Sequence, residues 1–239
     1  MTILPVAYLG SVEYFARILA GGCTIDLGEH YVKRSQRNRA RILTANGPMD
    51  LSVQLCRANH PGTPVRDMRI DYSKRWQHRH WVALVSAYRS SPFFDHYAGE
   101  LEPFYRRRYE FLADYDLELT ALLLRLLGDV PMPALAQRYV EAGPDDLDLR
   151  SRERERKAAG CARMGAANGE GGVPPGATGF AGADEKGPAF VAEPYFQLFS
   201  DRMPFVGNLS VIDLLFAEGP SAGPFLLSLI HISEPTRPY

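Results

Sequence analysis

A dense run of cationic and amide side chains begins soon after the second predicted strand. It comprises Lys33, Arg34, Arg37, Asn38, Arg39 and Arg41. If Arg37 to Arg41 is extended, its three arginines share one face, where their guanidinium groups suit a phosphate or a carboxylate. The alternative is a solvated edge strand whose charges deter aggregation. No aromatic residue interleaves the run to stack on bases, so we expect no nucleic-acid partner.

A second candidate site is the turn at Leu9, Gly10 and Ser11, between the first predicted strand and the first predicted helix. Free N–H groups at a helix N-terminus commonly bind anions. Asp26 falls at the end of the neighbouring strand, where a carboxylate binds a ribose or sugar diol. The chain has neither G-x-G-x-x-G nor a Walker lysine, so a plain capped helix is the alternative.

Acid–base chemistry needs a proton acceptor that titrates near neutrality, and the candidates are Glu29, His30, Asp71 and His80. None of them lies in a diagnostic motif. His78 and His80 are two residues apart and diverge on a helix, so we predict no metal site. The alternative for His80 is a core histidine whose hydrogen bonds are satisfied within the protein.

The elements that must position these residues begin with a strand-helix-strand unit. Val6 to Leu9 is a short apolar run, and Val12 to Ala20 has helical apolar spacing with Ser11 as its N-cap. Gly21 and Gly22 close that helix, and Cys23 to Leu27 forms the next strand. Such units pair their strands in parallel.

Alternating side chains around Asn46 and Gly47 predict a β-hairpin of Arg37 to Leu43 with Met49 to Leu55, and Arg69 to Tyr72 adds a short strand. The rest of the core is predicted to be helical. Trp76, His80, Leu84 and Tyr88 recur on one helix face. Further helices are predicted over Glu100–Leu112, Leu117–Leu127, Pro133–Glu141 and Asn208–Phe216, the last with Ser210 and Asp213 as a capping box.

The composition is that of a folded globular protein, with 46% apolar and 23% charged residues and a formal net charge of −1. Three scattered cysteines form no C-x-x-C pair, which favours a reducing compartment. No stretch has the length of a membrane span and no signal peptide is evident, so we expect a cytoplasmic protein. No motif identifies a cofactor or an oligomeric state.

The domain organisation predicted is one mixed α/β domain, with the strand-helix-strand unit and the hairpin packed against a helical C-terminal half. Residues 1–151 and 187–227 form the core. Residues 152–186 are rich in Gly, Ala and Pro and are predicted to be a disordered insert. The terminal SLIHISEPTRPY resembles a translated sequencing adapter, so we expect residues 228–239 to be a non-native tail.

Several long segments together resemble the WbqC-like family of bacterial proteins, named for a member encoded in an O-antigen gene cluster. The segments are AYLGSVEYFARI, DLGEHYVKRSQRNRARI, MRIDYSKRWQHRHW, SAYRSSPFF and YFQLFSDRMPFVGNLSVIDLLFAEGP. The form is similar to the Bacteroidetes-type branch, from which the Gly-rich insert departs. The resemblance implies a cytoplasmic role in surface-polysaccharide or glycoconjugate synthesis.

In that setting the basic run is interpreted as the site of a transferase that acts on a nucleotide-activated sugar or a similar anionic metabolite, such as an acyl donor. The alternative is a non-catalytic partner that binds a glycan intermediate or another enzyme. The residues assigned to catalysis are Asp26, Glu29 and His80. Those assigned to substrate binding are Tyr8, Gly10, Ser11, Lys33, Arg37, Asn38, Arg39 and Trp76.

Overall fold

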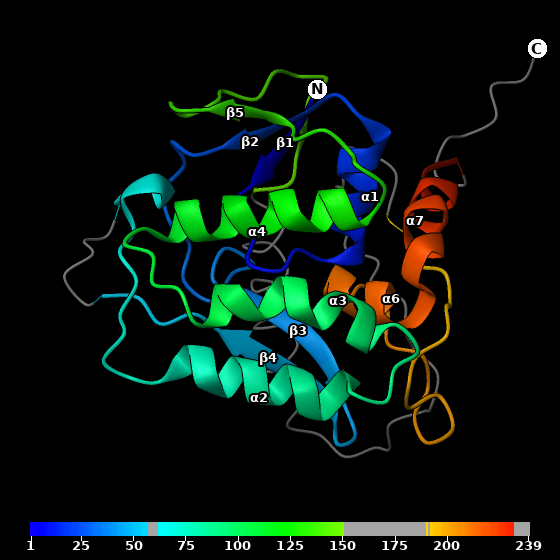
Figure 1. The fold of residues 1–239 in the computed structure, drawn as a ribbon. Helices are drawn as coiled ribbons and strands as arrows, with labels where there is room; N and C mark the ends of the chain where they lie inside the picture. Colours follow the sequence, from blue (N-terminus) through cyan, green and yellow to red (C-terminus); the bar gives the residue numbers. More distant parts are fainter. Residues whose placement is uncertain (57–61, 151–189, 191, 232–239) are drawn as a thin grey trace, which may run out of the picture.

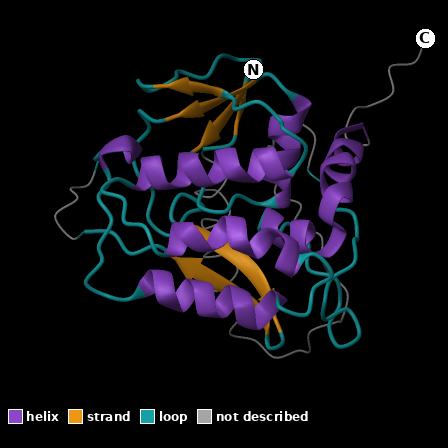
Figure 2. Ribbon diagram, viewed as in Figure 1, coloured by secondary structure: helices purple, strands orange, loops and turns teal. Residues whose placement is uncertain are grey.

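The computed structural model describes residues 1–56, 62–150, 190 and 192–231. A parallel four-stranded sheet has the order β5-β2-β1-β6, and a separate antiparallel hairpin pairs β3 with β4. Figures 1 and 2 show the sheet above helix α4, with the hairpin and α2 on the far side of α4. The predicted class, a single mixed α/β domain, is confirmed. The predicted insert and most of the predicted tail lie outside the described residues.

The opening unit follows the predicted order, with β1 (Thr2–Pro5), α1 (Val12–Ala20) and β2 (Cys23–Asp26). Strands β1 and β2 are parallel, with Thr2 opposite Cys23. The predicted strand at Val6 to Leu9 is wrong. Those residues form the buried turn after β1, where Leu9 adopts a φ of 44° and Tyr8 donates its N–H to the Gln36 carbonyl.

The hairpin is confirmed as β3 (Arg39–Thr44) and β4 (Gly47–Ser52). Gly47 turns the chain with a backbone φ of 104°, which residues other than glycine rarely adopt. Arg37 lies outside β3 and is buried, so the prediction that Arg37, Arg39 and Arg41 share one strand face is wrong. The predicted strand at Arg69 to Tyr72 is reduced to isolated bridges.

Helices α2, α3 and α4 lie beside the hairpin and the sheet (Figure 1). Helix α2 (Trp76–Tyr88) buries its predicted stripe, and α3 (Phe94–Leu101) continues into a 3₁₀ turn, so the helix predicted over Glu100–Leu112 is wrong. Helix α4 (Leu112–Leu126) contains the predicted apolar segment. Residues Ala134–Ala136 form strand β5 instead of a helix, and β6 (Leu147–Asp148) pairs beside β1.

Helices α6 (Val211–Glu218) and α7 (Ala222–His231) close the core against α1. The expected capping box is wrong, because Ser210 Oγ donates to the Leu9 carbonyl and makes no cap. Helix α6 is also not the final helix. Helix α7 continues through the first four residues of the predicted tail, and Leu229 is buried.

Candidate functional site

A cavity of about 320 Å³ lies at the carboxyl ends of β1 and β6. Strand β1 pairs with β2, which follows it through α1, along one edge and with β6 along its other edge. The strand order therefore changes direction between β1 and β6. Crevices at such switch points of parallel sheets are common ligand sites. Its wall includes Gly10, Ser11, Arg34, Arg39, Arg41 and Asn208.

The N-terminus of α1 at this cavity is occupied by the protein itself. The first-turn amides donate as follows: Val12 to the Leu209 carbonyl, Glu13 to Asn208 Oδ1 and Tyr14 to Ser11 Oγ. Ser11 is therefore the N-cap, as predicted. The N–H groups of Val12, Glu13 and Tyr14, which were predicted to be free, are therefore engaged within the protein. Gly10 remains necessary, because a Cβ would lie 2.6 Å from the Tyr14 ring.

Arg39 and Arg41 both line the cavity from strand β3, but their guanidinium groups differ in their partners. Arg41 Nε donates to Asp50 Oδ1 at 2.9 Å across the hairpin. Arg39 Nε is buried and has no hydrogen-bond partner among the described residues. A buried donor without an acceptor is costly, on the order of 1–3 kcal/mol. Arg39 is therefore the best candidate for binding an anion in the cavity.

Arg37, the centre of the predicted cluster, forms a buried ion pair with Glu29. Its Nε donates to Glu29 Oε1 at 2.9 Å, its Nη2 donates to Oε2, and Nη2 also reaches the Arg150 carbonyl at 3.3 Å. Burial raises the pKa of Glu29 above its ordinary value, and the hydrogen bond from Arg37 opposes that rise. The pair fixes the loop that leads into β3.

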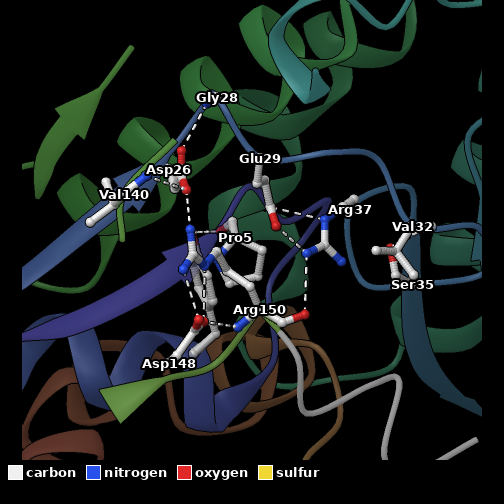
Figure 3. A network of polar contacts seen from close by, with 11 residues as sticks. Pro5, Asp26, Gly28, Glu29, Val32, Ser35, Arg37, Val140, Asp148 and Arg150 are labelled. Carbon is white, nitrogen blue, oxygen red and sulfur yellow. Dashed lines mark hydrogen bonds and ion pairs between the residues drawn. The ribbon is translucent and has the colours of Figure 1, made fainter. Parts of the chain in front are cut away.

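Asp26 lies beside this pair in a second buried cluster (Figure 3). Its carboxylate accepts hydrogen bonds from the Gly28 and Val140 amides at 2.8 and 3.1 Å and pairs with Arg150. Arg150 also binds Asp148 through two nitrogens. Asp26 is fully buried, and both of its oxygens are engaged in joining the ends of three strand-to-loop connections. This arrangement does not present the carboxylate to a sugar diol.

Asn38 follows Arg37 in the chain, and Lys33 lies between Glu29 and Arg37 in the sequence. Asn38 is buried, accepts a hydrogen bond from the Tyr31 hydroxyl at 2.9 Å and donates to the Val53 carbonyl at 3.0 Å. Lys33 is exposed and does not line the cavity. Asn38 therefore holds the loop in place.

Tyr8, Trp76 and His80 lie together in the aromatic core. His80 Nδ1 is 2.9 Å from the Tyr8 hydroxyl, which is 3.2 Å from the Tyr105 hydroxyl. Trp76 packs edge-on against His80. Burial lowers the pKa of His80 to about 4, so its ring is neutral near pH 7. These side chains do not line the cavity.

The structure thus separates the predicted site residues into three groups. Gly10, Ser11 and Arg39 line the cavity; Asp26, Glu29, Arg37 and Asn38 form the buried support beside it; Tyr8, Trp76 and His80 belong to the aromatic core. Two predicted catalytic residues, Glu29 and His80, therefore do not lie in one cavity with the predicted binding residues Arg37 and Arg39.

Sequence reasoning missed Asn208, Glu13 and Arg150. Asn208 lies 195 residues from Glu13 in the chain, and no local pattern joins them. Arg150 stood at the edge of a segment predicted to be disordered. The only local signal for Asn208 was its place in the tripeptide Asn208-Leu209-Ser210, where a polar side chain comes shortly before the buried helix α6.

The matching residues place the chain in a known family. The sequence model of the WbqC-like protein family matches residues 7–224. The chain belongs to the WbqC-like family. No curated protein and no solved structure matches it. The matched span includes every residue of the cavity wall and of the Arg37 and Arg150 pairs.

Two structural observations limit the kinds of site to consider. Within the described ranges, no group of three or more His, Cys, Asp and Glu side chains could hold a metal ion. No helix in the part of the chain that the structure describes is long and apolar enough to cross a membrane.

Proposed function

We propose that this WbqC-like protein binds an anionic metabolite in the switch-point cavity and is a cytoplasmic transferase of bacterial surface-polysaccharide synthesis. The ligand class is a nucleotide-activated sugar or a related phospho-metabolite. The family's link to an O-antigen gene cluster supplies the biological setting. The cavity supplies the site, because it lies where parallel α/β sheets bind ligands.

The unpaired Nε of Arg39 is the observation that carries this proposal. The Nε atoms of Arg37, Arg41 and Arg150 each donate to a carboxylate of the protein. The Nε of Arg39 has no such carboxylate among the described residues, and the Arg39 residue lines the cavity. A phosphate or carboxylate of the ligand would complete the same side-on geometry.

The other predicted residues take supporting roles in this proposal. The Glu29–Arg37 pair and Asn38 hold the loop before Arg39, and Gly10 and Ser11 form the wall opposite. Glu29, Asp26 and His80 are positioning residues, because their polar atoms are engaged inside the protein.

A non-catalytic binding protein of the same pathway is the second candidate. Its support is the absence of the predicted acid–base groups Asp26, Glu29 and His80 from the cavity wall in the described structure. Incubating the protein with donor and acceptor pairs separates the two functions, because only a transferase releases the free leaving group of the donor.

The test is thermal-shift screening against nucleotide sugars and acyl donors, with an Arg39→Gln variant. A ligand that binds only the folded state raises the melting temperature by mass action. We expect a shift of several degrees that Arg39→Gln loses. Arg106→Gln is the matched control, because it removes an exposed guanidinium that pairs with Glu102 away from the cavity.

Arg39→Gln should fold, because the Arg39 Nε makes no internal hydrogen bond among the described residues. The proposal fails if no ligand shifts the wild type. It also fails if the shift is the same in Arg39→Gln and in the wild type.

A further inference from the structure

The wall of the cavity is rich in groups that hydrogen-bond to hydroxyls. Beyond the arginines, its polar side chains among the described residues are two carboxylates, two amides, three serine hydroxyls and one tyrosine: Glu13, Asp50, Gln36, Asn208, Ser11, Ser35, Ser210 and Tyr14. Carboxylates accept from hydroxyls, and amides both donate and accept. This wall therefore suits a polyol that carries an anionic group.

Among the described residues, the wall of this cavity offers a nucleobase no exposed aromatic ring. Tyr14 is the one aromatic residue in the described part of the wall; the residue is about 3% exposed, and its hydroxyl donates to the Pro5 carbonyl at 3.0 Å. Bases bind proteins mainly by stacking on accessible aromatic or guanidinium planes. The volume of about 320 Å³ lies at the small end of the range for ligand pockets.

We infer that the cavity recognises a glycosyl phosphate through its phosphate and ring hydroxyls and has, among the described residues, no aromatic stacking subsite for a base. Arg39 binds the phosphate, and the carboxylates of the wall, which keep acceptor capacity beside their bonds within the protein, bind the hydroxyls. A nucleotide sugar would bind through its sugar phosphate, with its base outside the cavity. The inference rests on the proposed function, because it requires an anion at Arg39.

The experiment compares dissociation constants of the full chain by calorimetry for a panel of hexose 1-phosphates, their nucleotide diphosphate forms, the matching nucleoside monophosphates and inorganic phosphate. We expect at least one hexose 1-phosphate to bind within threefold of its nucleotide sugar. Uridine, guanosine and thymidine forms of one sugar should agree within threefold, and nucleoside monophosphates should bind at least tenfold more weakly.

The outcomes separate the two proposals. If a nucleotide sugar binds more than tenfold tighter than its sugar phosphate, or the base changes the affinity by more than tenfold, a base subsite exists and this inference is wrong. If phosphate binds but no sugar phosphate binds better, the inference also fails while the anion site stands. If neither phosphate nor any other probe binds, the proposed function itself fails.

A variant of the wall tests hydroxyl recognition separately. Asp50→Asn keeps an oxygen that can accept from Arg41 Nε but weakens acceptance from a sugar hydroxyl. We expect it to weaken sugar-phosphate binding at least fivefold and phosphate binding less than twofold. Asp114→Asn, an exposed carboxylate on α4, is the control. Equal losses for both ligands, or no loss for either, would contradict the assignment of Asp50.

Discussion

Asn208 caps helix α1 from 195 residues away along the chain. Its side-chain oxygen accepts a hydrogen bond from the Glu13 N–H at 3.0 Å, and its amide donates to the Glu13 carboxylate at 3.3 Å. Asn208 holds a φ of 54°, which asparagine tolerates better than most side chains. This reciprocal pair both stabilises α1 and closes one side of the cavity.

Replacing Asn208 should separate the cap from the backbone conformation. Asn208→Gly loses the cap, at a cost of about 1–2 kcal/mol, but keeps the positive φ without strain. Asn208→Ala should cost roughly a further 1 kcal/mol, because alanine resists the left-handed region. Urea unfolding measures both. If both variants match the wild type, Asn208 does not cap α1.

The buried Glu29–Arg37 pair should be far more sensitive than an exposed pair. Arg37→Met leaves a buried carboxylate without its guanidinium, at a cost of about 3–5 kcal/mol. The double variant with Glu29→Leu should recover most of that loss. Arg41→Met, which breaks the exposed pair with Asp50, is the control and should cost under about 1 kcal/mol. Comparable losses in both single variants would refute the difference between the pairs.

Asp116 on α4 should make the protein less stable as the pH rises. Its carboxyl is fully buried, neither oxygen has a partner among the described residues, and burial raises its pKa well above the ordinary value. The folded state favours the neutral form of Asp116. The contribution of this carboxyl to the free energy of unfolding is therefore fully present below about pH 4 and is lost as the pH rises toward the raised pKa.

Asp116→Asn removes this titration. Relative to the wild type, the variant should gain about 1.4 kcal/mol of unfolding free energy per pH unit within that window. Denaturation at pH 5, 6 and 7 measures the difference. A difference that does not change with pH would show that Asp116 is not held neutral.

His80 should give the opposite dependence on pH. Its pKa is lowered by burial to about 4 in the folded protein, whereas an unfolded histidine titrates near about 6.5. The stability it contributes is therefore present above about pH 6.5 and is lost as the pH falls toward 4.

NMR titration of the imidazole and unfolding of His80→Gln measure this effect. We expect the ring to remain neutral at pH 5.5. The stability advantage of the wild type should shrink by about 1.4 kcal/mol per pH unit below about 6.5. A ring that titrates near 6.5 in the folded protein would place His80 in contact with solvent.

Two glycines provide a matched test of the loop packing around Asp26. A Cβ on Gly28 would lie 2.2 Å from the Tyr139 backbone nitrogen, so Gly28→Ala must displace that loop and destabilise the fold. Gly99, within α3, has nothing within 4 Å of an added Cβ. Gly99→Ala should stabilise by about 0.5–1 kcal/mol, because alanine favours helices. Melting temperatures that move in the same direction would contradict the packing argument.

Local patterns were sufficient for several elements. Helix α1 begins and ends at the predicted residues because Ser11 and Gly21 act on their own neighbours in the chain. The hairpin followed from Gly47, and the buried stripe of α2 followed from four-residue spacing. The sequence motifs also identified the family correctly.

Local patterns failed where the outcome depended on partners distant in the chain. The apolar run at Val6 to Leu9 turns instead of extending, because Tyr8 pairs with Gln36 and the turn packs into the core. Residues 134–136 became a strand because β2 offered them a parallel edge.

By itself, the sequence determined the family, the α/β class, helix α1 and the hairpin. The tertiary structure alone decided whether Arg37 or Arg39 lines the cavity. The two residues are two positions apart and chemically identical, but the chain buries Glu29 within reach of Arg37, whereas Arg39 lines the cavity and its Nε has no hydrogen-bond partner among the described residues. The position of a carboxylate in space therefore separates the guanidinium of an internal ion pair from the one we propose for ligand binding, and no spacing along the chain encodes that position.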